Sequence, residues 1–542
     1  MRATGHWLGA QASNATAVLV RHCREGAADF AAMLRGPAAR RMLWLCAPAL
    51  VLGIILRVTL MAQMPCAFIN DDTRTIMSTV EEFVEKGRFE TSPKKVFLAP
   101  FLYSVPVFLH QPALPWIAAG QHVLGLFAVL AFGALCSLWF RCPAVWIAPL
   151  TLFGALNPDF LWYEHLALPE SMFLCFSLWT AVCGTLYFRR PTPARFALFW
   201  LALFLTAGSR PEGKLFCGFG IALAALAPAC GWLSRLRRGA VAILLTVWIF
   251  SITRTSQSGL LLFTSVIHFS PDHFVTAPGL EDDIREIRDR LAVEWRVRPS
   301  DMVKVRRQIS RAAEAYLAKH PPEPGKRHKD VINTLCKRAG IETVLRSPFR
   351  AMAMGFNKFC YTLRIPAAES FGKPWIRDEH MNIFYEPDGA KKDSMEYVVS
   401  LTGRNFANQE EFRAWLESAY RPFDPDWPTA ARNAFHRAMI HLRLPDREQD
   451  VIGFPLLHLA AIAGAMLLIV VSRGERWLHL SWAAALFGLL AIVFVTANVK
   501  ARFRFAFEPW WVIYACALVD LVASRAWGLW AKARGTAGGA GG

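Results

Sequence analysis

The stretch "MLWLCAPALVLGIILRVTLMA", residues 42 to 62, is a long and almost continuous apolar run. About 20 apolar residues are needed for a helix to cross a bilayer, because every backbone amide must be hydrogen bonded within the segment. We count about ten such runs, at residues 42–62, 115–139, 143–161, 166–188, 195–209, 212–232, 239–262, 452–472, 477–497 and 505–524. The sequence therefore predicts an all-α, polytopic membrane protein.

The composition supports this class. The 542 residues are 54% hydrophobic and 13% aromatic, with a mean hydropathy of +0.28, a bias typical of membrane proteins. The net charge is +18, but the basic residues are scattered at the ends of apolar runs. Nucleic-acid binding needs a basic face or tail, so we expect no nucleic-acid partner, and we expect membrane lipids instead.

Charge also predicts which loops share a side of the membrane. Short cytoplasmic loops collect Arg and Lys, and a cytoplasmic N-terminus places on one side Arg40, Arg41, Arg141, Arg189, Arg190, Arg235, Arg237, Arg238, Arg473, Arg476, Arg525, Lys532 and Arg534. The opposite, outer side then receives residues 63–114, the turns near 162 and 210, residues 270–450 and the turn near 500. Of the 42 acidic residues, 27 lie in residues 271–450, and most of the others, including Glu508, fall on the outer side.

These patterns divide the chain into five parts. We expect a basic cytoplasmic segment over 1–41, a transmembrane module over 42–270 with a first outer loop over 63–114, a periplasmic or lumenal insertion over 271–450, C-terminal transmembrane helices over 451–525 and a disordered tail over 526–542. We expect the insertion to be mainly helical and exposed to water. Asn408 and Glu411 have the spacing of a capping box, which predicts that a helix begins there. Cys336 and Cys360 share this region, and the sequence leaves their pairing open.

The stretch "INDDTRTIMSTVEEFVEKGRF", residues 69 to 89, opens the first outer loop. Asn70 is placed to cap a helix and Gly87 to end it. An apolar stripe predicts an amphipathic helix on the membrane surface; its members are Ile76, Val80, Phe83 and Val84. Asp71 and Asp72 either complement the positive end of that helix or act as a general base at the water interface.

Two further stretches place basic residues on the outer side, against the general trend. "SRPEGK" contains Arg210 and Lys214 together with Glu212, and "NVKARFRFAFEPWW" contains Lys500, Arg502 and Arg504. Arg suits phosphate because its planar fork donates two parallel hydrogen bonds to one anion. The alternative is that these long side chains only reach the interface from helix ends.

A fourth stretch, "NPDFLWYEHLALPESMF", residues 157 to 173, is an acidic outer turn. Glu164, His165, Glu170 and the Glu212 of the neighbouring motif are candidates for positioning a substrate or acceptor. His165 is also a candidate metal ligand. Helix ends commonly collect such residues without a function, so both interpretations stay open.

The acidic pair, the turn "YEHLALPES", the outer "SRPEG" and the late "RFRFAFEPWW" together resemble the GT-C membrane glycosyltransferases. Within these, the chain is most similar to the protein-mannosyltransferase and lipid A aminoarabinose-transferase branch. The resemblance covers residues 42–270 and 452–524. It implies an enzyme of the inner (plasma) membrane that transfers a sugar from a polyprenyl-phosphate donor to a lipid, glycan or protein acceptor, with inversion, on the periplasmic or exterior side.

By this resemblance Asp71 or Asp72 is the catalytic base, and Arg502 and Arg504 face the donor phosphate. Cationic side chains or a divalent metal ion would neutralise the leaving group, and the sequence leaves the use of a metal open. The chain departs from the family by having two Asp where Asp followed by Glu is frequent. It also places its polar insertion before the last three helices rather than after them.

Two other functions are alternatives. A transporter or flippase of lipid-linked sugars would place charges near the middle of several spans and would use broken helices. Neither feature is evident in the sequence, because its charges cluster at the outer ends of the predicted spans. A scaffold without activity would use residues 271–450 to bind a partner, and its binding would not depend on Asp71 or Asp72.

Overall fold

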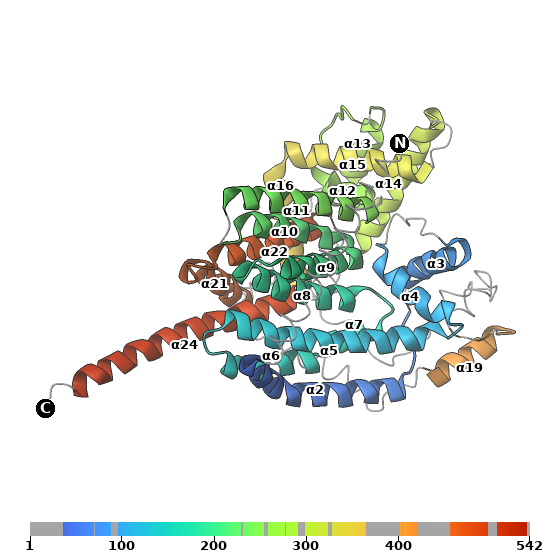
Figure 1. The fold of residues 1–542 in the computed structure, drawn as a ribbon. Helices are drawn as coiled ribbons and strands as arrows, with labels where there is room; N and C mark the ends of the chain where they lie inside the picture. Colours follow the sequence, from blue (N-terminus) through green and yellow to red (C-terminus); the bar gives the residue numbers. More distant parts are fainter. Residues whose placement is uncertain are drawn as a thin grey trace, which may run out of the picture.

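The structure is a computed structural model, and it describes residues 36–69, 71–87, 96–228, 231–253, 258–276, 278–290, 299–322, 328–364, 402, 404, 406–419, 456–496 and 507–538. Across these ranges the chain is helical and forms no β-strand. A single parallel β-bridge joins Phe68 to Leu166. The predicted all-α class is therefore confirmed (Figure 1).

The N-terminal half forms a layered helical bundle. Helices α2 (Pro37–Gln63), α5 (Ala113–Trp139) and α6 (Pro143–Leu156) pack together, and α8 (Glu170–Arg189) and α9 (Pro193–Ser209) lie on the other side of α5 (Figure 1). Small residues permit the close approach, since a Cβ added at Gly133 would lie 2.5 Å from Sγ of Cys46. Such contacts hold membrane helices together, because lipid gives them no hydrophobic driving force to associate.

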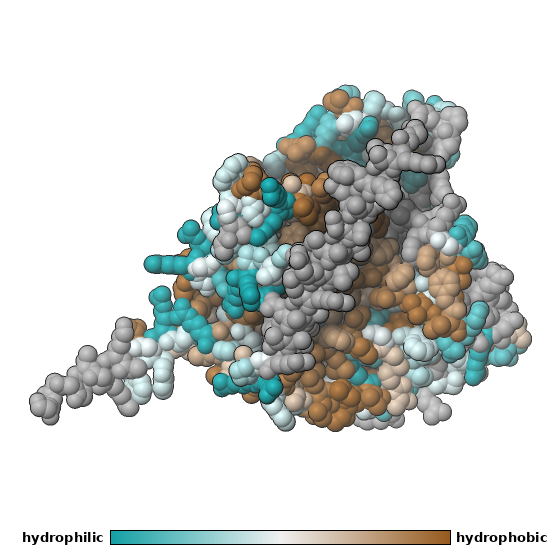
Figure 2. Space-filling view, viewed as in Figure 1, coloured by the Kyte–Doolittle hydropathy of each residue, from teal (hydrophilic) through white to brown (hydrophobic). Residues whose placement is uncertain are grey.

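The bundle continues through helices from both halves of the chain. α10 (Phe216–Leu226) and α11 (Trp232–Ile252) pack beside α22 (Arg476–Thr496), and α21 (Leu456–Val471) packs along α24 (Glu508–Gly538). A Cβ at Gly464 of α21 would lie 2.0 Å from the carbonyl oxygen of Tyr514, so only glycine fits there. Figure 2 shows apolar residues in brown over the lower face of this bundle and hydrophilic residues in teal at its left edge and top.

Among the described helices, four are long and apolar enough to cross a membrane: α2, α5, α8 and the Glu508–Trp530 part of α24. The pair α6 and α7 (Pro158–His165) is bent by 44° and would make a fifth span. The bend follows from Asn157-Pro158, because the residue before proline is driven out of the helical region. The described residues thus have four or five candidate membrane spans, as expected for a membrane protein, and a ten-span arrangement stays a prediction.

The other predicted spans coincide with shorter or divided helices. Residues 212–232 divide into the 3₁₀ turn η1 (Pro211–Leu215) and α10, and residues 239–262 divide between α11 and α12 (Ser258–Val266). At 1.5 Å per residue, α10, α12 and α21 are each too short to cross the hydrocarbon core alone. α24 continues to Gly538, whereas the sequence predicts disorder from residue 526; Ala, Lys and Leu in that stretch favour helix.

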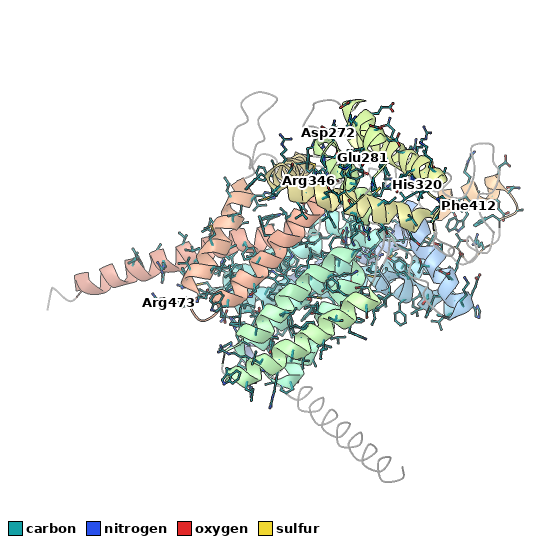
Figure 3. The ribbon with its side chains drawn as sticks, turned by 90° about the horizontal axis from the view of Figure 1, so that it is seen from above. Asp272, Glu281, His320, Arg346, Phe412 and Arg473 are labelled. Atoms are coloured by element: carbon teal, nitrogen blue, oxygen red, sulfur yellow. The ribbon has the colours of Figure 1, made fainter. Side chains whose placement is uncertain are left out.

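The helices have two chemically different ends. At the end that we call the basic end, Arg189 pairs with Glu475, and the Asp520 carboxylate accepts hydrogen bonds from the backbone N–H groups of Arg141 and Cys142. Loops that the charge pattern assigns to one side therefore meet. Figure 3 shows Arg473 at this end, far from Asp272, Glu281 and Arg346.

The described part of the insertion shares a second core with α12, which lies before the predicted boundary at residue 270. α12, α13 (Glu281–Arg290), α14 (Pro299–Lys319), α15 (His328–Arg346) and α16 (Pro348–Arg364) contribute to it, with Phe263, Ile309 and Ala313 fully buried. α19 (Gln409–Ala419) begins as predicted, because Asn408 Oδ1 accepts from the Glu411 N–H at 2.9 Å. Cys336 is a buried free thiol, and the side chain of Cys360 is outside the described side chains.

Candidate functional site

The predicted helix of the first outer loop is present as α3 (Asp71–Lys86). It ends as expected at Gly87, whose φ of 63° is the left-handed conformation that favours glycine. Its apolar stripe is nevertheless buried at Ile76 and Val80, because α3 packs on α4 (Leu98–Phe108). The expectation that this stripe lies on the membrane surface is therefore wrong, and α4 exposes apolar side chains in its place.

Three hydrogen bonds attach the start of α3 to the acidic turn. The Phe68 N–H donates to the His165 carbonyl at 2.7 Å, and the Ala167 N–H donates to the Phe68 carbonyl at 2.8 Å. The Thr73 hydroxyl donates to the Ala167 carbonyl at 3.1 Å. The backbone of Asp71 and Asp72 is thus held beside residues 165–168, while their side chains are outside the described ones.

Glu164 forms a buried ion pair with Arg57 of α2. Arg57 Nη2 lies 2.6 Å from Glu164 Oε1 and Arg57 Nε lies 2.8 Å from Oε2, so the contact is bidentate. Arg57 Nη1 also donates to the Ala155 carbonyl at the end of α6. Arg57 is 3% exposed and Glu164 is 2% exposed. Arg57 therefore joins α2, α6 and α7 from inside the bundle, where charges need a partner.

Two histidines extend this ion pair. His122 Nδ1 lies 2.8 Å from Glu164 Oε2, and His122 Nε2 lies 3.0 Å from His165 Nδ1. Neutral rings satisfy both contacts if His165 donates to His122 and His122 donates to the carboxylate. The His165 ring also packs against the Phe68 ring, at 4.9 Å between centroids. Among the described residues, no group of three or more His, Cys, Asp or Glu side chains is arranged to hold a metal ion.

A glycine makes room for Glu164. A Cβ added at Gly125 of α5 would lie 1.9 Å from Glu164 Oε1 and 2.2 Å from its Cδ. Gly125 is one turn after Gln121 and His122, so this stretch of α5 supplies both the space and the partners of the acidic turn. The Glu164 carboxylate fits only because position 125 has no side chain.

Gln121 holds the next part of the turn. Its Nε2 donates to the Leu166 carbonyl at 2.7 Å and to the Tyr103 hydroxyl at 3.0 Å, and its Oε1 accepts from the Ser171 hydroxyl. The Tyr103 hydroxyl in turn donates to the Leu168 carbonyl. Backbone carbonyls that would be costly to bury without partners are thereby satisfied, which fixes the shape of residues 166–171.

Arg210 joins the acidic turn to the "SRPEGK" motif. Its Nη1 lies 2.8 Å from Glu170 Oε1 in the first turn of α8, and its contacts with Glu212 are longer, at 3.3 and 3.4 Å. Lys214 donates to the Thr253 carbonyl at the end of α11. We call this end of the bundle, with the α3 start, residues 164–171 and residues 210–214, the acidic end.

The described end of the last predicted motif, residues 507–511, lies at an unexpected depth in the bundle. Lys500, Arg502 and Arg504 lie outside the described residues, but α24 begins directly after them. Trp510 packs on Trp482, in the second turn of α22, and on Trp139, the last residue of α5. Both partners are nearer the basic end. Glu508 therefore lies away from the acidic end, contrary to the outer position expected for it.

The sequence analysis missed three members of this network: Arg57, Gln121 and His122. Each is a polar residue inside a predicted span, and such residues in membranes usually face a partner. That signal was present, although it does not identify the partner. Comparison of the chain with protein-family models, curated proteins and solved structures gives no match.

Proposed function

We propose that this protein is an integral membrane glycosyltransferase. It transfers a sugar from a polyprenyl-phosphate donor to a lipid, glycan or protein acceptor, and the reaction takes place at the acidic end. One observation carries the proposal: three segments singled out by their chemistry, far apart in sequence, are hydrogen bonded to one another there. Residues 68–73 contact residues 165–167, and Glu170 contacts Arg210.

In the proposed reaction Asp71 or Asp72 is the general base. The carboxylate takes the proton of an acceptor hydroxyl while that oxygen bonds to the anomeric carbon. The bond from this carbon to the phosphate oxygen breaks with inversion, and polyprenyl phosphate leaves as an anion. A positioned base contributes about 10² to 10⁴-fold to such a step.

Arg210 is the described cation best placed for the donor phosphate. Its bond to Glu170 is short and buried, whereas its bonds to the part-exposed Glu212 are long. A phosphate can therefore replace Glu212 while Glu170 keeps the guanidinium oriented. The negative charges of Glu170 and Glu212 balance the positive charges of Arg210 and Lys214. Binding a phosphate therefore requires additional positive charge at this end. Lys500, Arg502 and Arg504 are our candidates for it.

Glu164, His165 and Gln121 act on the site indirectly in this proposal. Glu164 and His165 are linked through His122, and Gln121 holds the backbone of the acidic turn. Their burial keeps all three from a substrate. We assign them a positioning role, in which they hold the turn that orients the start of α3. Pre-organisation of this kind matters because a displacement of about 1 Å can cost 10²-fold in rate.

The experiment uses the purified full-length protein in nanodiscs with a panel of radiolabelled polyprenyl-phosphate sugars and native membrane extract. We expect a labelled product with the wild type and at least a 10²-fold lower rate with Asp71→Asn or Asp72→Asn. Glu82→Gln is the matched control, because Glu82 lies on the same helix in a surface pair with Lys86. Full rates in both single variants and in the double variant would remove the base assignment.

A second candidate is a transporter or flippase of lipid-linked sugars, favoured by two observations. Arg57, Glu164 and His122 form a buried ionisable chain between spans, and α6 and α7 form a bent pair. Proteoliposomes separate the two functions. Movement of a lipid-linked sugar analogue between leaflets, blocked by Glu164→Gln and without glycosyl product, would support transport over transfer.

A further inference from the structure

An apolar corner projects from the insertion where α15 meets α16. Leu345 is in the last turn of α15, and Phe349 and Met352 follow on α16; they are 74%, 84% and 61% exposed. The insertion is expected to be water-exposed, and large apolar side chains gathered in water are costly. This corner therefore needs something to cover it.

Phe349 and Met352 lie on one face of α16. They are three positions apart, and the opposite face buries Ala351 and Met354. The helix thus packs with one face and presents large apolar groups with the other, at the 3.6-residue period expected for two different environments.

The neighbouring helix indicates the environment. α16 packs against α22, an apolar helix that coincides with the predicted span 477–497 and whose Phe487 is 68% exposed. Arg346 contacts Glu342 and the carbonyl of His273, and Figure 3 shows it at the end opposite Arg473. α16 therefore lies beside an apolar helix, and the corner at the start of α16 lies toward the outer end, where the headgroup region is expected.

The charges around the corner match an anionic surface. α16 contains no acidic residue, and Arg350 is exposed beside Phe349. Helices that lie in the bilayer interface combine apolar residues with Arg or Lys in this way, and their binding increases with anionic lipid. The amphipathic helix of the first loop has its apolar stripe buried against protein, so α16 is the better interfacial element.

We propose that the α15–α16 corner inserts Leu345, Phe349 and Met352 into the outer leaflet, with Arg350 on anionic phospholipid headgroups. The corner thereby fixes the insertion against the membrane at a second point, besides its connections to the spanning helices. This proposal is independent of the enzymatic activity.

The test is site-specific photo-crosslinking of the full-length protein in nanodiscs made of phosphatidylglycerol and phosphatidylcholine. A diazirine amino acid replaces Phe349, or replaces the exposed Glu314 of α14 as the matched control. We expect lipid adducts at 349, enriched in phosphatidylglycerol, and few at 314. In the presence of Arg350→Gln the preference for phosphatidylglycerol should fall about five-fold, the factor that one cationic side chain near an anionic surface supplies.

The adduct identifies what covers the corner. Equal lipid labelling at 349 and 314 would overturn the proposal, and so would peptide adducts at 349 from residues 365–401 or from a second copy of the chain. Lipid adducts without headgroup preference would keep insertion but overturn the anionic contact. Thermal stability of each variant, measured on the same samples, shows that the fold is retained.

Discussion

Gly125→Ala is the sharpest test of the buried network, because the change adds one methyl group. The new Cβ would lie 1.9 Å from Glu164 Oε1, far inside contact distance, so the carboxylate must move. It cannot move without losing its bidentate contact with Arg57 and its contact with His122. Both partners are buried, and displacement would leave the guanidinium without its counter-ion.

The expected cost follows from two opposing effects. Breaking a buried ion pair from one side costs about 3–5 kcal/mol, and replacing a helical glycine by alanine gains up to about 1 kcal/mol. We therefore expect a net loss of about 2–4 kcal/mol. If most of this loss appears in the unfolding rate, the half-life at a fixed temperature falls about 30-fold or more.

The assay is the survival of the folded full-length protein in nanodiscs after heating, followed by size-exclusion chromatography. Gly120→Ala is the matched control on the same helix, because nothing lies within 4 Å of its added Cβ; it should be neutral or slightly stabilising. Equal half-lives for the two variants would refute the reasoning. In a background with Arg57→Met and Glu164→Ala, Gly125→Ala should lose its effect.

Three further changes test other parts of the structure by the same heating assay. Arg210→Gln leaves the Glu170 carboxylate buried without the guanidinium that pairs with it, and should lower the free energy of unfolding by about 3–5 kcal/mol. A loss of stability no larger than that on replacing an exposed Arg would contradict this. Asp520→Ala removes the carboxylate that accepts from the backbone N–H groups just before α6, and should lower the free energy of unfolding by about 1–2 kcal/mol. Burial lowers the pKa of Lys358 to about 7. Between that pH and the ordinary pKa of Lys, the unfolded chain therefore binds one more proton than the folded chain. The free energy of unfolding should rise from pH 7 toward pH 10, and Lys358→Met should reduce this rise.

The parts of the fold that the sequence predicts correctly are local. Gly87 ends α3 and Asn408 caps α19 because each device acts within one helical turn. Long apolar runs mark helices for the same reason, since each backbone amide bonds within its own segment. The number of spans is harder to predict from the sequence, because it depends on where prolines and glycines divide an apolar run. Pro158, for example, divides residues 143–161.

The contacts that build the acidic end are not local. Arg57 and Glu164 are separated by 107 residues, and no spacing rule connects them. An Arg within an apolar run indicates that a partner exists, but only the packing of α2, α5 and α6 identifies Glu164. The glycine at 125 is similarly uninformative in the sequence, because its role appears only when the carboxylate is placed above it.

The buried contacts also narrow the choice of catalytic base. A base must come within about 2.6–3.2 Å of the acceptor hydroxyl. Glu164 is enclosed by Arg57, His122 and Gly125, and Glu170 holds Arg210 from a buried position, so neither meets this requirement without unfolding the turn. We therefore keep Asp71 and Asp72, beside that turn, as the candidates for the base in the proposed reaction. Loss of transfer in a thermally stable Glu164→Gln variant, with full transfer in the Asp71 and Asp72 double variant, would reverse this assignment.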